Sequence, residues 1–121
     1  MPLPIKMLEE FFEAEFSFED HQLGQLTHFD GYAHWHLLCD REKQFLKIQA
    51  GRDSSGSAYP TVEIEGVYSD DCSVLPLTGG GTSLILRPRG IDRVSHFVAI
   101  TKTKHGSLSI STCVGETKPA A

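Results

Sequence analysis

Residues 32–39 read Tyr-Ala-His-Trp-His-Leu-Leu-Cys, and this stretch decides the fold class of the chain. In an extended segment, successive side chains point to opposite faces of a sheet. The apolar side chains that would then share one face are those of Ala33, Trp35, Leu37 and Cys39. His34 and His36 would share the other face, where we expect solvent. The alternation therefore predicts a strand that is buried on one side only.

The same period of two continues toward the C-terminus. The strand predicted at 61–67 shows it clearly, because Val62 and Ile64 face one way while Glu63 and Glu65 face the other. The full set of strands predicted after 32–39 is 45–50, 61–67, 72–75, 83–87, 95–104 and 107–114. A polar turn at 40–43 and loops at 51–60 and 78–82 are expected between them. A hairpin turn joins the last two strands.

The N-terminal segment has a helical period instead. Pro4 suits the first turn of a helix. Apolar side chains then recur on one helical face at Ile5, Leu8, Phe12 and Phe16. We therefore predict an amphipathic helix over residues 4–16 that docks on a sheet. Residues 17–31 are expected to form a turn, a short strand and another turn.

Together these segments predict a mainly β protein. Short strands separated by turn signals, without β-α-β alternation, are typical of antiparallel sheets. We expect an antiparallel β-sandwich or a partly open barrel of about six to eight strands with one N-terminal amphipathic helix. The 121 residues fit a single domain, 1–121, with a β region at 32–114 and a frayed tail at 115–121.

The composition is ordinary for a globular domain. Hydrophobic residues make up 40% and charged residues 22% of the chain, and no apolar run is long enough to span a membrane. Glu9 and Glu10 follow the N-terminus too closely for a signal-peptide core. The three cysteines include no Cys-x-x-Cys pair, which indicates reduced thiols. We therefore expect a cytoplasmic protein.

Charge is distributed unevenly. The formal net charge is −5, and nearly all of the 16 acidic residues precede Cys72, whereas basic residues outnumber acidic ones after it. Nucleic-acid binding needs clustered Lys and Arg, so this distribution argues against it. Arg87, Arg89 and Arg93 form only a local basic group. An acidic portion of this kind is suited to attract a protein with a basic surface.

His34 and His36 are the sharpest chemical signal in the chain. Two imidazoles on one face of a strand can hold a transition metal, with His28, Asp30, Asp40 or His96 as further ligands. A His-x-His strand followed by a carboxylate and a later histidine resembles the metal-binding motifs of cupins. That resemblance implies a β-barrel enzyme with one divalent transition metal on His34, His36, Asp40 and His96. The glycine and proline spacings of the cupin motifs are not matched.

No complete catalytic motif occurs elsewhere. Ser54 and Ser55 do not lie in a Gly-x-Ser-x-Gly elbow. Cys39 is a possible nucleophile beside a histidine, but it shares the apolar face of its strand and is expected in the core. We therefore favour a protein without chemistry, and without a cofactor, over an enzyme.

The overall run of the chain resembles small bacterial immunity-type domains, which neutralise a toxin by binding it. The resemblance spans about residues 18–114. It lies in the acidic N-terminal part, Asp20-His21 before the sheet, a strand–turn–strand unit ending in Glu65-Gly66-Val67, and a closing hairpin. It implies a non-enzymatic module that covers a basic target surface.

The leading expectation is thus a protein-binding or inhibitory module that acts through an acidic surface. The residues expected on that surface are Glu9, Glu10, Glu13, Glu15, Glu19, Asp20, Glu63, Glu65, Asp70 and Asp71. The cupin-like metalloenzyme is the alternative. A further possibility is a homodimer formed through a strand edge, since residues 83–87 and 107–114 carry few charges.

Overall fold

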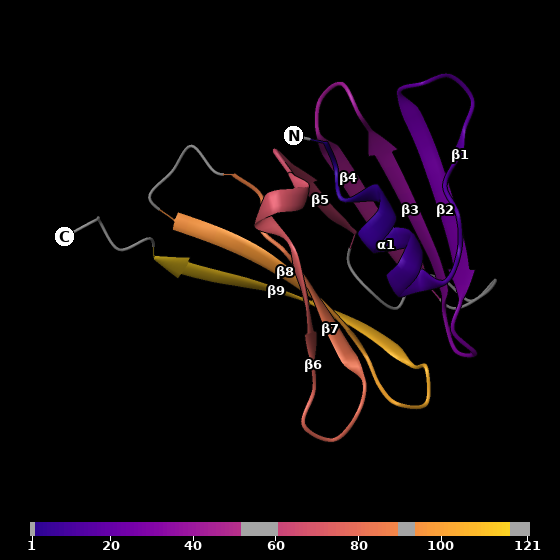
Figure 1. Cartoon of the computed structure of the whole chain (residues 1–121), viewed down its shortest axis with the longest axis vertical. Helices are drawn as coiled ribbons and strands as arrows, with labels where there is room; N and C mark the ends of the chain where they lie inside the picture. The colour runs from indigo at the N-terminus through magenta and orange to yellow at the C-terminus, as the bar shows by residue number, and fades with distance from the viewer. Residues whose placement is uncertain (1, 52–60, 90–93, 117–121) are drawn as a thin grey trace.

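The chain folds into two antiparallel sheets with one helix, as the fold prediction expected (Figure 1). The computed structural model describes residues 2–51, 61–89 and 94–116, and for 94–96 and 113–116 it describes the backbone alone. Each sheet is a meander in which neighbouring strands follow chain order, and the described strands form no closed barrel. The fold is therefore consistent with the expected sandwich or partly open barrel.

The helix α1 spans Ile5–Phe12. The first sheet contains β1 (Ser17–Phe18), β2 (Leu23–Phe29), β3 (His34–Asp40), β4 (Phe45–Gly51) and β5 (Val62–Glu65). A short 3-10 turn, η1 (Ser69–Asp71), leads to the second sheet. That sheet contains β6 (Ser73–Pro76), β7 (Thr82–Leu86), β8 (Val94–Lys102) and β9 (Leu108–Glu116). The described residues thus form nine strands, one more than the largest number predicted.

The predicted helix over 4–16 was wrong at its C-terminal end. Glu13 adopts a left-handed conformation, with φ of 54°, and stops α1 after Phe12. The carboxylate of Glu9 then accepts a hydrogen bond of 2.8 Å from the Phe16 N–H and holds the turn. The apolar stripe was nevertheless read correctly, because Leu8, Phe12 and Phe16 are all buried.

The short strand predicted within residues 17–31 corresponds to β2, but it is longer than expected, and Ser17–Phe18 form β1 where the first turn was predicted. β2 pairs with β3 along its whole length, from Leu23 opposite Asp40 to Phe29 opposite His34. Gly24 lies in this strand because the ring of Phe18, on β1, fills the space that a side chain would need. An aromatic ring that covers a strand glycine in this way compensates for the missing side chain.

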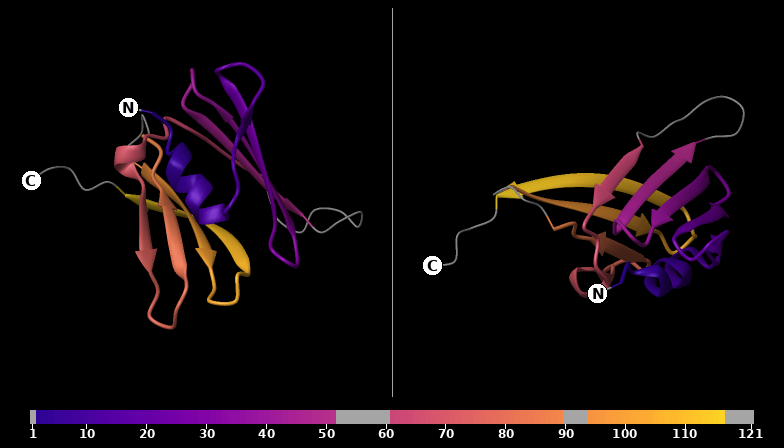
Figure 2. Two further views of the ribbon diagram at one scale, coloured as in Figure 1. Left: turned by 45° about the vertical axis from the view of Figure 1, so that its right-hand side comes forward. Right: turned by 90° about the horizontal axis from the view of Figure 1, so that it is seen from above.

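The core lies between the sheets and is completed by α1 (Figure 2). The Phe12 ring lies 6.0 Å from the ring of Trp35 on β3. On the other side of the helix, the ammonium of Lys102 from β8 donates to the carbonyl of Phe11. The helix therefore contacts both sheets. Burial of one such aromatic side chain stabilises the fold by about 1.5–3 kcal/mol.

The alternation predicted for β3 is confirmed. Its inward side chains, which belong to Trp35, Leu37 and Cys39, are buried, with Trp35 only 1% exposed. The same holds for β4 and β5, whose inward side chains are Leu46, Ile48, Ala50, Val62 and Ile64. The hairpin turn between β8 and β9 is confirmed as well, through a hydrogen bond of 2.9 Å from the Thr103 N–H to the Ser107 carbonyl. The predicted loop at 51–60 and tail at 115–121 lie largely outside the described residues.

One carboxylate ties the two sheets together at the β2–β3 turn. Asp30 Oδ1 accepts hydrogen bonds from the N–H groups of Tyr32 and Ala33, at 2.8 and 2.7 Å. Asp30 Oδ2 accepts from the Trp35 indole at 3.3 Å and from the backbone of Leu108, at the start of β9, at 3.0 Å. Burial would raise the pKa of Asp30, but these hydrogen bonds outweigh it and lower the pKa.

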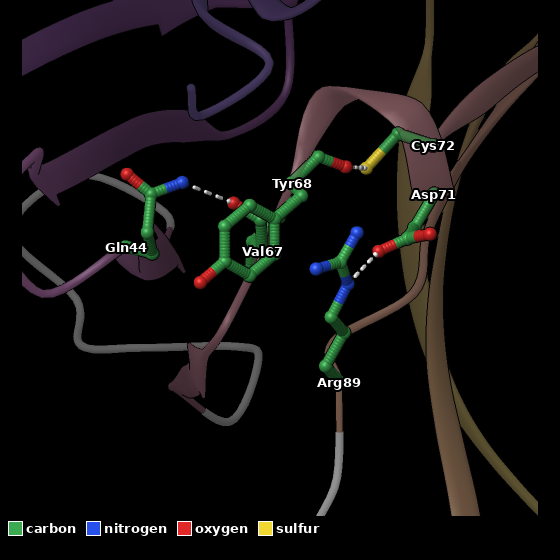
Figure 3. Close-up of polar contacts among 6 residues, drawn as sticks. All are labelled: Gln44, Val67, Tyr68, Asp71, Cys72 and Arg89. Carbon is green, nitrogen blue, oxygen red and sulfur yellow. Dashed lines mark hydrogen bonds and ion pairs between the residues drawn. The ribbon is translucent and has the colours of Figure 1, made fainter. Parts of the chain in front are cut away.

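A second junction lies at the other end of the first sheet (Figure 3). The Gln44 amide donates to the Val67 carbonyl at 2.9 Å, and the Arg89 N–H donates to the Gly66 carbonyl at 3.0 Å. The guanidinium of Arg89 lies between the Tyr68 ring, 4.0 Å from its centroid, and the Asp71 carboxylate, at 2.7 Å. The chain therefore passes from one sheet to the other through a hydrogen-bonded seam.

We expect Asp30→Ala to lower the free energy of unfolding by roughly 2–4 kcal/mol, because the Trp35 and Leu108 N–H groups lose their shared acceptor. Asp40→Ala is the matched control, since Asp40 accepts only from the exposed N–H groups of Glu42 and Lys43. Urea denaturation of both variants measures the difference. Equal losses in the two variants would contradict the role assigned to Asp30.

The folded protein should also lose stability on mild acidification because of His28. Burial, and then the nearby Lys102, lower the pKa of His28 against the opposing effect of Asp30 and Glu13. The unfolded chain therefore binds a proton at a higher pH, and stability falls as the pH drops below about 6.5. In urea titrations between pH 7.5 and roughly pH 5, His28→Phe should flatten this slope. His36→Gln, on the opposite face, should leave it in place.

Candidate functional site

The outer face of the first sheet is the strongest candidate site. Strand register places its side chains in cross-strand rows, of which two cover all of β2 to β5. The first row is Leu23, Asp40, Phe45 and Glu65, and the second is Gln25, Leu38, Lys47 and Glu63. Leu23 is 55% exposed, while Leu38 and Phe45 are half-buried. An apolar centre therefore lies on the face that the alternation of apolar and polar residues predicts to be exposed to solvent.

Two adjoining hollows mark this centre. The larger, of about 380 Å³, is lined by Leu23, Gly24, Leu38, Cys39, Asp40, Lys43, Phe45 and Glu65. The smaller, of about 190 Å³, is lined by Ser17, Glu19, Leu23, Gly24, Gln25 and Leu38. Both share Leu23, Gly24 and Leu38, so the hollows meet across β2 and β3. Together they form a shallow, mainly apolar depression with room for protruding side chains.

Exposed aromatic side chains lie on the same outer face, near the β2–β3 turn. Phe29 is 55% exposed, and its ring stacks on that of His34 with centroids 4.5 Å apart. Tyr32, in the turn itself, is 72% exposed. His36 lies beside Gln25, with 3.3 Å between the ring nitrogen and the amide oxygen. Aromatic rings of this kind are enriched where proteins contact other proteins.

Acidic residues border the apolar centre. Glu19 lies on the β1 side, at the smaller hollow, and Glu63 and Glu65 lie on β5 at the other side. Glu63 is 3.9 Å from Lys47, yet 59% of its side chain stays exposed. An ion pair at such a surface contributes little and leaves the carboxylate accessible. The face thus combines an apolar centre with a mainly acidic margin.

The structure does not bring the ten predicted acidic residues onto one surface. Two of them bond to the local backbone: Glu9 holds the turn after α1, and Asp20 accepts from the N–H groups of Gln22 and Leu23. A third, Asp71, pairs with the side chain of Arg89. The hydrogen bonds from Leu23 and Gln22 lower the pKa of Asp20. Glu13 lies 3.7 Å from Lys102. Glu10, Glu15 and Asp70 are exposed elsewhere, so only Glu19, Glu63 and Glu65 belong to the outer face.

The described side chains supply no third metal ligand beside His34 and His36. His34 and His36 do share the outer face of β3, as predicted, together with Asp40. Asp40, however, accepts from the backbone of the β3–β4 turn. The side chain of His96 lies outside the described part of the chain. No group of three or more His, Cys, Asp or Glu side chains among the described residues is placed to hold a metal ion.

The two cysteines whose side chains are described, Cys39 and Cys72, are poorly suited to act as nucleophiles. Cys39 and Cys72 are free and buried, and burial raises the pKa of both thiols. A raised pKa disfavours the reactive thiolate. The prediction that Cys39 belongs to the core is therefore confirmed. The side chain of Cys113 is not described.

A larger groove, of about 520 Å³, lies where β5 meets the second sheet. Its lining includes Val62, Ile64, Arg89, Phe97 and Thr112. Thr61 and Arg89, at its margins, adjoin in sequence the segments 52–60 and 90–93, which lie outside the described residues. The outer face of the first sheet, in contrast, combines its hollows with exposed apolar and aromatic side chains.

Comparisons with protein-family models, curated proteins and solved structures found no match to this chain. The described part of the chain contains no helix with the length and apolar character needed to cross a bilayer. The sequence analysis did not predict the apolar centre, because the short strand expected within 17–31 was not paired with a partner strand, and because Leu38 and Phe45 fall at polar positions of the alternation. Pairing β2 with β3 in register was the signal that would have found it.

Proposed function

We propose that this protein is a binding module without chemistry of its own, and that it holds a partner protein on the outer face of β2 to β5. The observation that carries the proposal is the apolar centre formed by the exposed Leu23 and the half-buried Leu38 and Phe45, bordered by carboxylates. Stable protein interfaces have this arrangement, with an apolar or aromatic centre and a polar margin. The partner should present apolar side chains surrounded by basic residues.

The distribution of charge between the two sheets also favours a partner with a basic surface. The acidic part of the sequence forms α1, the first sheet and η1, whereas the second sheet comes from the part in which basic residues outnumber acidic ones. The uneven charge along the chain therefore becomes an uneven charge between the two sheets. Such a field speeds the association of a basic protein and is screened by salt. A toxin-neutralising role of the immunity type is one form that this function would take.

The test compares variants of the proposed face with variants elsewhere. The face pair is Leu23→Ser with Tyr32→Ser, both at exposed positions. The matched control pair is Val74→Ser with Leu75→Ser, which also replaces exposed apolar side chains but lies on β6, off the face. A partner captured from the native host with the wild-type chain is purified, and its affinity for all three proteins is measured. We expect the face pair to weaken binding at least about tenfold, equivalent to 1.4 kcal/mol, and the control pair to leave it unchanged.

The contribution of the acidic residues is tested separately, through the association rate. The association rate of the wild-type complex should fall as ionic strength rises, and Glu19→Gln, Glu63→Gln and Glu65→Gln together should flatten that dependence. An association rate that is independent of salt concentration would contradict the role proposed for the acidic margin. Equal binding by the face and control pairs would refute the proposed face itself.

A further inference from the structure

The two sheets end in four edge strands, and three of these are protected against pairing with another strand. β1 has only two residues, β5 carries Glu63 and Glu65, and β6 contains Pro76. Short length, charge and proline are the usual means by which edges are blunted. β9 has none of them: it is nine residues long, with no proline and no charge before Glu116. It is the one unprotected edge among the described strands.

The hydrogen-bond pattern shows which backbone groups β9 turns outward. The Thr103 N–H donates to the Ser107 carbonyl, so that pair belongs to the β8–β9 ladder. Bonded and non-bonded pairs alternate in an antiparallel ladder, so the N–H and C=O groups of Leu108, Ile110, Thr112 and Val114 face away from β8. The Leu108 N–H confirms this orientation, because it donates to Asp30 in the other sheet. No described residue accepts from Ile110 or Thr112.

The opposite edge of the same sheet differs. The Leu77 N–H donates to the Gly81 carbonyl, which makes Val74 and Pro76 the outward residues of β6. Proline has no N–H, so Pro76 removes a donor at the C-terminal end of that edge. The exposed side chains of Val74 and Leu75 therefore lie on an edge that pairs poorly. The two edges of one sheet are thus unequal, and only β9 offers a run of free donors and acceptors.

We propose that a second copy of this chain pairs with β9, antiparallel and about a twofold axis, so that the two four-stranded sheets become continuous. In such a pairing each strand meets itself, and a charged strand would repel its own copy. The stretch from Leu108 to Gly115 contains no charged residue, which makes it self-complementary. An axis at Thr112 places Ile110 opposite Val114. In this register the paired residues begin after Leu108, whose N–H already donates to Asp30.

The interface does not overlap the proposed binding face. It lies on the second sheet, whereas Leu23, Leu38 and Phe45 lie on the first. Outward side chains beside the edge, such as Ser109 and Ser111, are small, uncharged and exposed. They place neither bulk nor charge between two approaching copies. A failure of either proposal therefore leaves the other standing.

The test is the mass of the full chain in sedimentation experiments across a range of concentrations. We expect the wild-type chain to form dimers in a concentration-dependent way. Thr112→Pro removes an outward N–H without touching the ladder to β8, and Ser111→Lys places like charges across the twofold axis. Each should weaken the dimer at least about tenfold. Leu75→Lys, on β6, is the matched control and should leave the dimer intact.

Each result decides the question. A wild-type chain that stays monomeric at every concentration overturns the proposal, and so does a dimer that survives both β9 variants. Loss of the dimer in Leu75→Lys alone would assign the interface to β6 and also overturn it. Thermal melts establish that the variants fold. If Thr112→Pro does not fold, Ser111→Lys, at an exposed position, decides alone.

Discussion

The ionised carboxylate of Asp30 is the contact on which the arrangement of the two sheets depends most. It shapes the β2–β3 turn through Tyr32 and Ala33, orients the Trp35 indole in the core, and fixes the first residue of β9. A neutral side chain in its place would leave buried donors without an acceptor, which costs more than the hydrogen bonds themselves contribute. One acidic residue thus couples a turn, the largest core side chain and the second sheet.

The open edges of the sandwich explain why a single helix suffices to complete the core. Sheets that are not closed by hydrogen bonds must be held by packing between their inner faces. α1 supplies Phe12 to the first sheet and accepts Lys102 from the second. Because the helix and the core use the inner faces, the outer face of the first sheet and the outer edge of the second are among the surfaces left for other molecules. The two proposals concern these two surfaces.

The predicted parts of the fold are those in which a local pattern sufficed. Alternation in β3, β4 and β5 identified their buried side chains, because each strand has one wet face. β2 was predicted only as a short strand between two turns, because Gly24 and the polar residues after it resemble a turn until β3 is placed beside them. β7 was taken for a possible edge, but it lies between β6 and β8, since strand order cannot be read from local composition. The end of α1 depended on Glu9, whose carboxylate holds a turn beyond the helix.

The candidate site was predictable only in part for the same reason. Counting acidic residues could not separate Glu9, Asp20 and Asp71, which bond to the local backbone or to Arg89, from Glu63 and Glu65, which border the outer face. The two proposed surfaces also differ physically. Binding on the outer face depends on side chains, whereas pairing along β9 depends mainly on backbone groups and on the absence of charge. Since they share no residue, substitutions in the two should act additively, and each can be altered without changing the other.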